Sequence, residues 1–201
     1  MTTRLTTTFG PSALATPANA VTIGRVLATP VLLALMASDS TQLRWPVCGL
    51  WIVLACTDGL DGYLARRMGS TRSGAFLDPL ADKFLVLGAM GVLVAKGRFW
   101  WLPVVIVAAR EVAISLYRSS MGRQGVSVPA RSLAKAKTVV QDVAVGFAVL
   151  PWTADAHRGI ATTVLWVAVV LTVVSGLQYA FDGRKVVGRD GVVLEGRAGA
   201  M

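Results

Sequence analysis

Long apolar runs, separated by short polar stretches, make up most of this chain. A helix needs about 20 mostly apolar residues to cross a bilayer. The breaks between the runs are rich in Gly, Ser, Asp and Arg, which is typical of turns. The pattern therefore predicts an all-α polytopic membrane protein with six transmembrane helices. The six apolar segments are 20–38, 46–66, 75–96, 100–121, 133–152 and 160–181.

The same pattern predicts one membrane domain at 20–181, with a polar, Thr-rich segment at 1–19 before it. A Gly-rich basic tail follows at 182–201, and we expect it to be loosely ordered. Residues 1–19 are not followed by a short apolar core with a small-residue cleavage site, so we expect no removable signal peptide. Trp100 and Trp101 are typical of interfacial anchors.

Composition supports the membrane class. Hydrophobic residues make up 54% of the chain, and charged residues make up 15%, against about 25% in soluble domains. The net charge is +9, but the basic residues gather beside apolar segments, which favours lipid headgroups and loop orientation over nucleic acid. Cys48 and Cys56 lie eight apart on one predicted helix and cannot bridge to each other.

The basic residues also predict an orientation. With the N-terminus inside, six crossings place thirteen basic residues inside and four outside. The inside set is Arg4, Arg66, Arg67, Arg72, Arg118, Arg123, Arg131, Lys135, Lys137, Arg184, Lys185, Arg189 and Arg197. The outside set is Arg44, Lys96, Arg98 and Arg158. The positive-inside rule therefore places both termini in the cytoplasm.

Four aspartates lie in predicted membrane segments, where a charged side chain is energetically unfavourable. Asp58, Asp61, Asp78 and Asp82 fall within 25 residues, and a charge at the centre of a membrane helix costs about 2.5–3.5 kcal/mol. Spacings of three and four put each pair on one helix face. A short link joins the two segments, so we expect antiparallel neighbours whose carboxylates converge near the cytoplasmic end.

Clustered carboxylates need cations to stay ionised. Oxygen-only ligands suit Mg²⁺, Mn²⁺ or Ca²⁺, and four aspartates could hold two ions while leaving positions for a phosphate-bearing substrate. Gly62, Ala65 and Gly74 share the acidic faces, so they leave room for a ligand; close helix packing is the competing explanation. A metal site beside Arg66 fits phosphoryl chemistry.

These residues resemble the signature of the CDP-alcohol phosphatidyltransferases, D-x-x-D-G-x-x-A-R followed by G-x-x-x-D-x-x-x-D. Residues 58–66 read DGLDGYLAR and residues 74–82 read GAFLDPLAD. The intervening spacer has seven residues, one fewer than is usual in the family. The resemblance implies six membrane helices and a cytoplasmic-side site with two divalent cations, Mg²⁺ or Mn²⁺.

The resemblance also implies roles for individual residues. Asp58, Asp61 and Asp78 would ligate metal, and Asp82 would act as general base while also touching the second ion. The CDP-lipid would be bound by Asn19, Thr22, Gly62, Ala65, Arg66 and Gly74.

Other stretches resemble the glycerophosphate branch of the family, the phosphatidylglycerophosphate synthases. They are NAVTIGR at 19–25, AREVAISLYR at 109–118, AKAKTVVQ at 134–141 and SGLQY at 175–179. This branch implies CDP-diacylglycerol and glycerol 3-phosphate as substrates. The acceptor phosphate, a dianion, would be bound by Arg110, Arg118, Lys135 and Lys137. Glu111 or Asp142 could instead serve as the partner of Arg110, and Lys135 and Lys137 could be positive-inside anchors.

Several alternatives stay open from the sequence. The same chemistry could use inositol phosphate, phosphatidylglycerol or serine as acceptor. A divalent-cation transporter also keeps aspartates in membrane helices, although the neighbouring Arg66, Arg67 and Arg72 would repel a permeating cation. The resemblance implies a bacterial-type inner or plasma membrane. Dimerisation is common in the family, and the sequence does not decide it.

Overall fold

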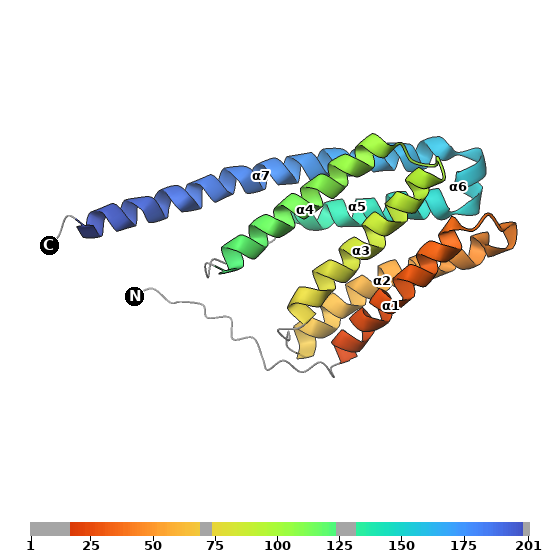
Figure 1. Cartoon of the computed structure of the whole chain (residues 1–201), viewed down its shortest axis with the longest axis horizontal. Helices are drawn as coiled ribbons and strands as arrows, with labels where there is room; N and C mark the ends of the chain where they lie inside the picture. The colour runs from red at the N-terminus through yellow and green to blue at the C-terminus, as the bar shows by residue number, and fades with distance from the viewer. Residues whose placement is uncertain (1–16, 69–73, 124–131, 199–201) are drawn as a thin grey trace.

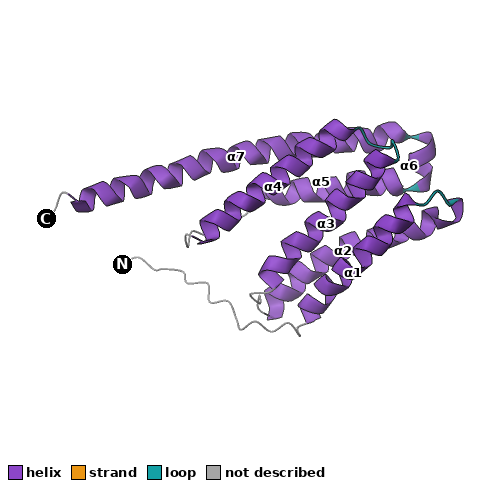
Figure 2. Cartoon of the chain, viewed as in Figure 1, coloured by secondary structure: helices purple, strands orange, loops and turns teal. Residues whose placement is uncertain are grey.

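The computed structural model describes residues 17–68, 74–123 and 132–198, and all regular structure in these ranges is helical (Figure 2). Side chains are described over smaller ranges, which leave out 17–19, 58–68, 74–79, 132–135 and 179–198 among others. The helices are α1 (Pro17–Ala37), α2 (Arg44–Met68), α3 (Gly74–Ala95), α4 (Trp101–Arg123), α5 (Ser132–Val149), α6 (Pro151–Ala156) and α7 (Arg158–Ala198), with a 3₁₀ turn, η1 (Thr41–Leu43).

Each of the six predicted apolar segments falls chiefly on one long helix, although the segment 133–152 runs past the end of α5 into α6. The short helix α6 was not predicted; it begins where Pro151 occupies a first-turn position, the place in a helix where proline is best tolerated. Helix α7 continues to Ala198 instead of ending at 181, and its last part extends past the other helices (Figure 1). Residues 182–198 contain no proline, so no backbone hydrogen bond of the helix is lost to a proline there.

Two helices in the described part are long and apolar enough to cross a membrane. The windows are Ala20–Ala37, with a mean hydropathy of 1.9, and Arg158–Gln178, with 2.2. Only 28% and 33% of these windows are buried, whereas a core helix of a soluble protein would be mostly covered. Large apolar side chains elsewhere are also exposed, including Leu27 at 69% and Leu116 at 66%. This outward-facing apolar surface suits a lipid environment.

The long helices pack as two groups of three. Helix α1 contacts both α2 and α3, while α7 contacts both α5 and α4; α2–α5, α3–α4 and α3–α5 contacts join the groups (Figure 1). Large buried side chains such as Trp51, Met90 and Leu165 fill the centre. Small buried residues such as Ala89 and Ala144 lie in the same core. Because lipid tails are as apolar as leucine, close van der Waals packing rather than water exclusion stabilises such a bundle.

Two basic residues after α3 cap other helices. Lys96 Nζ donates to the carbonyl oxygens of Met36, Ala37 and Ser38 at the end of α1, at 3.2, 3.3 and 2.7 Å. Arg98 Nη1 donates to the Ala148 carbonyl at the end of α5, at 2.8 Å. The last carbonyls of a helix have no intrahelical partner and carry partial negative charge. Lys96 and Arg98 therefore tie the α3–α4 connection to the ends of α1 and α5.

Exposed tryptophans mark the same end of the bundle. Trp45, Trp100, Trp101 and Trp152 stand at the starts of α2 and α4 and in α6, and all are more than half exposed. Tryptophan gathers at membrane–water interfaces because its ring is apolar and its N–H is polar. These four residues therefore indicate the interfacial level at this end. The prediction that Cys48 and Cys56 do not bridge is confirmed, since both are free.

Candidate active site

The two acidic motifs lie on α2 and α3 at one end of the bundle. Asp58 and Asp61 belong to the last three turns of α2, while Asp78 and Asp82 belong to the first turns of α3. Five residues separate the two helices, so their acidic ends meet at the same end of the molecule (Figure 1). Described contacts of α2 and α3 are chiefly with α1, which packs against both.

Only one of these four aspartate side chains is described. Asp82 is partly buried and takes part in an interaction. The side chains of Asp58, Asp61 and Asp78 lie outside the described set, as do those of Asn19, Ala65 and Arg66, and Gly62 and Gly74 fall in the same ranges. Among the residues that the structure describes, no group of three or more His, Cys, Asp or Glu could hold a metal. The convergence of all four carboxylates remains a prediction.

A charged cluster is buried between α4, α5 and α7. Glu111, which is 8% exposed, pairs through Oε1 with Lys137 of α5, which is 4% exposed. The same oxygen accepts a hydrogen bond from Arg110 Nη1 at 3.2 Å. Two cations thus share one carboxylate, and both are residues that the sequence predicted for acceptor binding. Removing charges from water costs several kcal/mol per ion, which only close pairing offsets.

Arg110 is fixed by α7 as well. Its Nη2 donates to Ser175 Oγ at 2.9 Å, and Ser175 Oγ donates to the Thr172 carbonyl at 3.0 Å. A Cβ added to Gly176 would lie 3.5 Å from Arg110 Cγ, so the arginine side chain lies across this glycine. Gln141 Nε2 donates to Thr172 Oγ1 at 3.1 Å and adds a second polar contact between α5 and α7. Such side-chain hydrogen bonds hold membrane helices in register.

A further link joins this cluster to the acidic helix. Lys83, the residue after Asp82 on α3, donates through Nζ to Ser115 Oγ of α4 at 2.5 Å. Ser115 Oγ in turn donates to the Glu111 carbonyl at 2.5 Å. The segment of α3 that carries Asp82 is therefore held against the segment of α4 that carries Arg110 and Glu111.

The predicted acceptor set is partly assembled in the described residues. Arg110 and Lys137 come together around Glu111, whereas the side chains of Arg118 and Lys135 lie outside the described set. The alternative that Glu111 is a partner of Arg110 is also confirmed. Lys83 was not predicted as a site residue. Its position inside an apolar segment was the available signal, because an intramembrane cation needs a polar partner.

Helix α1 contributes a second buried polar group. Thr22 and Arg25 are each 1% exposed, and Thr29 Oγ1 donates to the Arg25 carbonyl at 2.8 Å. Thr22 was predicted to contact the CDP-lipid and is covered by neighbouring helices in this structure. Arg25 is one of the largest fully buried side chains, which marks this end of α1 as polar inside the bundle.

The described part of the chain is all-helical, with an acidic motif on α2 and α3 and a buried cationic cluster around Glu111. The family model for CDP-alcohol phosphatidyltransferase matches residues 15–174. The chain therefore belongs to the CDP-alcohol phosphatidyltransferase family and is an enzyme of this class. Family membership also overturns the transporter alternative.

Curated relatives agree with this assignment. The chain is 36% identical over 183 residues to a probable phosphatidylglycerophosphate synthase of Mycobacterium tuberculosis (strain H37Rv), covering 89% of this chain and 87% of the relative. It is 39% identical over 172 residues to the CDP-diacylglycerol–glycerol-3-phosphate 3-phosphatidyltransferase of Escherichia coli (strain K12), covering 82% and 92%. The corresponding enzyme of Rickettsia bellii is 33% identical over 170 residues, covering 80% and 91%.

Proposed function

We propose that this enzyme transfers the phosphatidyl group of CDP-diacylglycerol to glycerol 3-phosphate, giving phosphatidylglycerophosphate and CMP. Relatives that match most of the chain are named for this reaction. The motifs of the glycerophosphate branch support the same acceptor. Inositol phosphate, phosphatidylglycerol and serine are the alternative acceptors that an assay must separate.

The observation that carries the proposal is the pairing of Arg110 and Lys137 around Glu111. A phosphorylated acceptor is a dianion and needs cations held in position. Two cations on one carboxylate leave a net positive charge, and Lys83 adds another cation through Ser115. Arg118 and Lys135 are proposed to complete this acceptor site from the adjoining turns of α4 and α5.

We propose that the six long helices are membrane spans and that both termini and the active site face the cytoplasm. Thirteen basic residues on the predicted inside, against four outside, support this orientation. The proposed domain boundaries stay at 20–181, although the last helix continues beyond this range. Assembly as a homodimer stays a family-based prediction.

Asp58, Asp61, Asp78 and Asp82 are proposed to hold two divalent cations, Mg²⁺ or Mn²⁺. The donor set fits by its chemistry, because carboxylate oxygens suit these cations and the four aspartates stand at helical spacings of three and four on the adjoining ends of α2 and α3. When bound, the metal would neutralise charge on the pyrophosphate of the CDP-lipid.

The residues of the chain have separate tasks in the proposed reaction. Arg110, Lys137, Arg118 and Lys135 bind the acceptor phosphate, while Asp82 takes the proton from the attacking hydroxyl. The hydroxyl oxygen forms a new bond to the phosphorus that carries the diacylglycerol, and the bond from that phosphorus to the bridging oxygen of CMP breaks in line. Arg66 and the small residues Gly62, Ala65 and Gly74, with Asn19 and Thr22, are proposed to bind the CDP-lipid.

The test is CMP release from CDP-diacylglycerol by the purified full-length protein with Mg²⁺ or Mn²⁺. Glycerol 3-phosphate, inositol phosphate, inositol, serine and phosphatidylglycerol are compared as acceptors. Release that requires glycerol 3-phosphate supports the proposal. Release that requires another acceptor keeps the reaction class and overturns the acceptor assignment.

A further inference from the structure

Asp82 lies on the face of α3 that is turned into the bundle. Val86, Ala89 and Leu93 follow Asp82 at intervals of four, seven and eleven residues, which places all four on one helix face. The three apolar residues are at most 3% exposed, whereas Phe84, on the other side of the helix, is 50% exposed. A rotation of α3 about its own axis would therefore turn Asp82 away from the interior.

Two contacts fix this rotation, and they lie on different sides of Asp82. Lys83 is one residue further along α3, about 100° around the helix, and its Nζ donates to Ser115 Oγ of α4 at 2.5 Å. Gly88 lies about 120° from Asp82 in the other direction, and a Cβ there would meet Leu33 of α1 at 2.7 Å. Asp82 consequently faces the sector of the bundle between α4 and α1.

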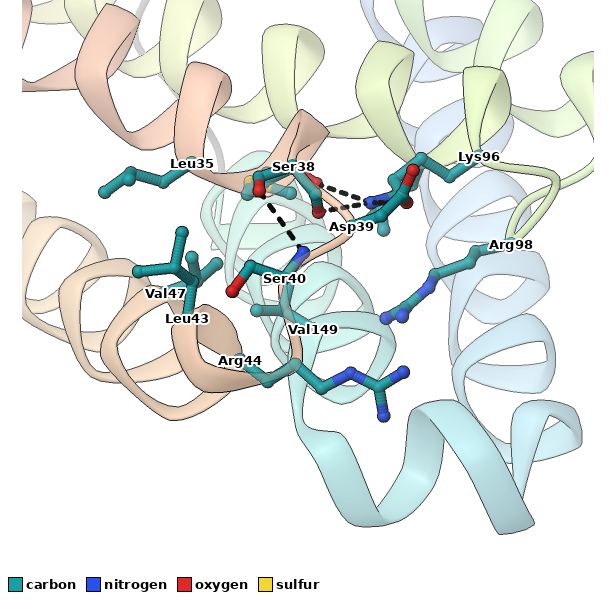
Figure 3. A pocket seen from close by; sticks show the side chains of 12 residues that line it. Leu35, Ser38, Asp39, Ser40, Leu43, Arg44, Val47, Lys96, Arg98 and Val149 are labelled. Atoms are coloured by element: carbon teal, nitrogen blue, oxygen red, sulfur yellow. Dashed lines mark hydrogen bonds and ion pairs between the residues drawn. The ribbon is translucent and has the colours of Figure 1, made fainter.

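The far end of α3 is held separately. Lys96, directly after the helix, donates to the Ser38 carbonyl at 2.7 Å and pairs with Asp39 at 3.0 Å (Figure 3). Twelve residues separate Lys83 from Ala95, where α3 ends, which is about 18 Å along a helix. Lys96 therefore fixes the end of α3 that is remote from Asp82, and Lys83 fixes the end that carries it.

Ser115 connects Lys83 to the acceptor cluster. Its Oγ accepts from Lys83 and donates to the carbonyl of Glu111, one turn earlier on α4, at 2.5 Å. Glu111 in turn pairs with Arg110 and Lys137 through its carboxylate. A shift of α3 at the Lys83–Ser115 contact would change the distance between Asp82 and the proposed acceptor phosphate.

We propose that Lys83 is a positioning residue, which directs Asp82 towards the acceptor through its hydrogen bond to Ser115. The proposal rests on the proposed role of Asp82 as general base. A general base acts only within hydrogen-bond reach of its hydroxyl, and a misplacement of 1 Å can lower a rate by about 10²-fold. Positioning differs from adding charge to the acceptor site, because it requires the hydroxyl of Ser115 as well as the ammonium group of Lys83.

The test measures CMP release by the purified full-length protein, with the acceptor that the wild type uses. Ser115→Ala keeps the lysine charge, so we expect kcat to fall about tenfold while KM for the acceptor changes by less than about twofold. Lys83→Met should show the same loss of kcat, and the double variant should be no slower than Lys83→Met, since both changes break one contact. Lys83→Arg retains a donor for Ser115 and should recover part of kcat.

Ser120→Ala is the matched control. Ser120 is an exposed residue of α4 whose Oγ also donates to a carbonyl of its own helix, that of Tyr117, at 2.8 Å. Its variant should have the kcat of the wild type. Thermal unfolding of every variant is measured as well, and kcat is compared well below each melting temperature, where a loss of stability alone leaves kcat unchanged.

Three results would overturn the positioning role. They are wild-type kcat in Ser115→Ala, an equal loss in Ser120→Ala, and additive losses in the double variant. If Asp82→Asn is inactive in the same assay, any of these results leaves the proposed function intact. Full activity of Asp82→Asn overturns both the base assignment and the positioning role.

Discussion

Glu111 of α4 and Lys137 of α5 form an ion pair in the middle of the bundle, and Arg110 shares the same carboxylate oxygen. The two side chains of the pair are 10% and 5% exposed. A buried pair that loses one member leaves an uncompensated charge. Glu111 therefore keeps two cations close together, which is the arrangement that the proposed acceptor site requires.

Glu111→Gln should separate these cations. The side chain keeps its shape but no longer neutralises Arg110 and Lys137, so we expect the free energy of unfolding to fall by about 3 kcal/mol. The KM for glycerol 3-phosphate should rise more than the KM for CDP-diacylglycerol. Steady-state kinetics and thermal unfolding of the purified variant measure both effects.

Two comparisons make this result interpretable. Glu111→Asp retains the charge and should recover part of the acceptor affinity. Asp39→Asn removes a carboxylate whose side chain is 95% exposed and should leave both KM values unchanged. Equal increases in the two KM values for Glu111→Gln would mean that Glu111 is only structural.

Arg110→Lys should weaken acceptor binding although the charge is kept. The arginine bonds Glu111 through Nη1 and Ser175 through Nη2, and one ammonium group cannot reproduce both directions. We expect kcat/KM for glycerol 3-phosphate to fall by about 10–150-fold, since one charge-assisted hydrogen bond is worth roughly 1.5–3 kcal/mol.

Ser175→Ala tests the same contact from α7 and should show a smaller loss. Thr162→Ala is its control, because Thr162 also donates to a carbonyl of its own helix, at 3.2 Å from Arg158 O, without touching the cluster. A loss in Thr162→Ala equal to that in Ser175→Ala would contradict the assigned role of Ser175.

The long helices were predictable because each contains a long apolar run. The ends were less predictable. Helix α7 continues to Ala198. Residues 182–198 contain no proline, but their four glycines disfavour a helix, so the end of the apolar run at 181 was the only boundary that the pattern offered. Helix α6 has only six residues between α5 and α7, too few for a periodic signal.

For the candidate site, too, some features were predictable and others were not. The aspartates and Arg110 could each be recognised individually, since charged residues in apolar segments are rare. The connection between them was not, because the Lys83–Ser115 contact spans 32 residues and depends on how α3 packs against α4. Likewise, Lys96 and Arg98 looked like loop charges, and only the packed structure reveals them as caps of α1 and α5.

Gly88→Val should weaken the packing of α1 on α3. A Cβ at position 88 would lie 2.7 Å from Leu33 Cδ1, so Gly88→Ala needs only a shift of a flexible side chain, while the larger valine overpacks the contact by about 1–3 kcal/mol. Leu33→Ala should restore stability to the Gly88→Val protein. Thermal unfolding is measured for the wild type, the two single variants and the double variant. Additive changes in stability would contradict a contact between positions 33 and 88.

Acidification should remove the Lys96–Asp39 pair. The pKa of Asp39 lies below its ordinary value of 3.8 because Lys96 donates to the carboxylate and attracts its charge. A depressed folded-state pKa contributes stability above the unfolded value and loses it as pH falls through the folded value. The small difference in melting temperature between wild type and Asp39→Asn should therefore be constant near neutral pH. It should vanish once the pH falls below the folded-state pKa of Asp39. A difference that grew on acidification would contradict the assignment.

Asp82→Asn should abolish turnover while binding of the CDP-lipid persists. Asp82 is partly buried on α3 and precedes Lys83, whose Nζ bonds Ser115 of α4, so it lies beside the proposed acceptor cluster. An amide keeps the size of the carboxylate but cannot accept the hydroxyl proton, and loss of a general base lowers rates by about 10²–10⁴-fold. CMP release measures turnover, and retention of labelled CDP-diacylglycerol measures binding. Asp58→Asn, in contrast, should lose binding and metal dependence together. Full activity in Asp82→Asn would remove the base assignment and leave the proposed acceptor cluster intact, because Arg110, Glu111 and Lys137 are tested by their own variants.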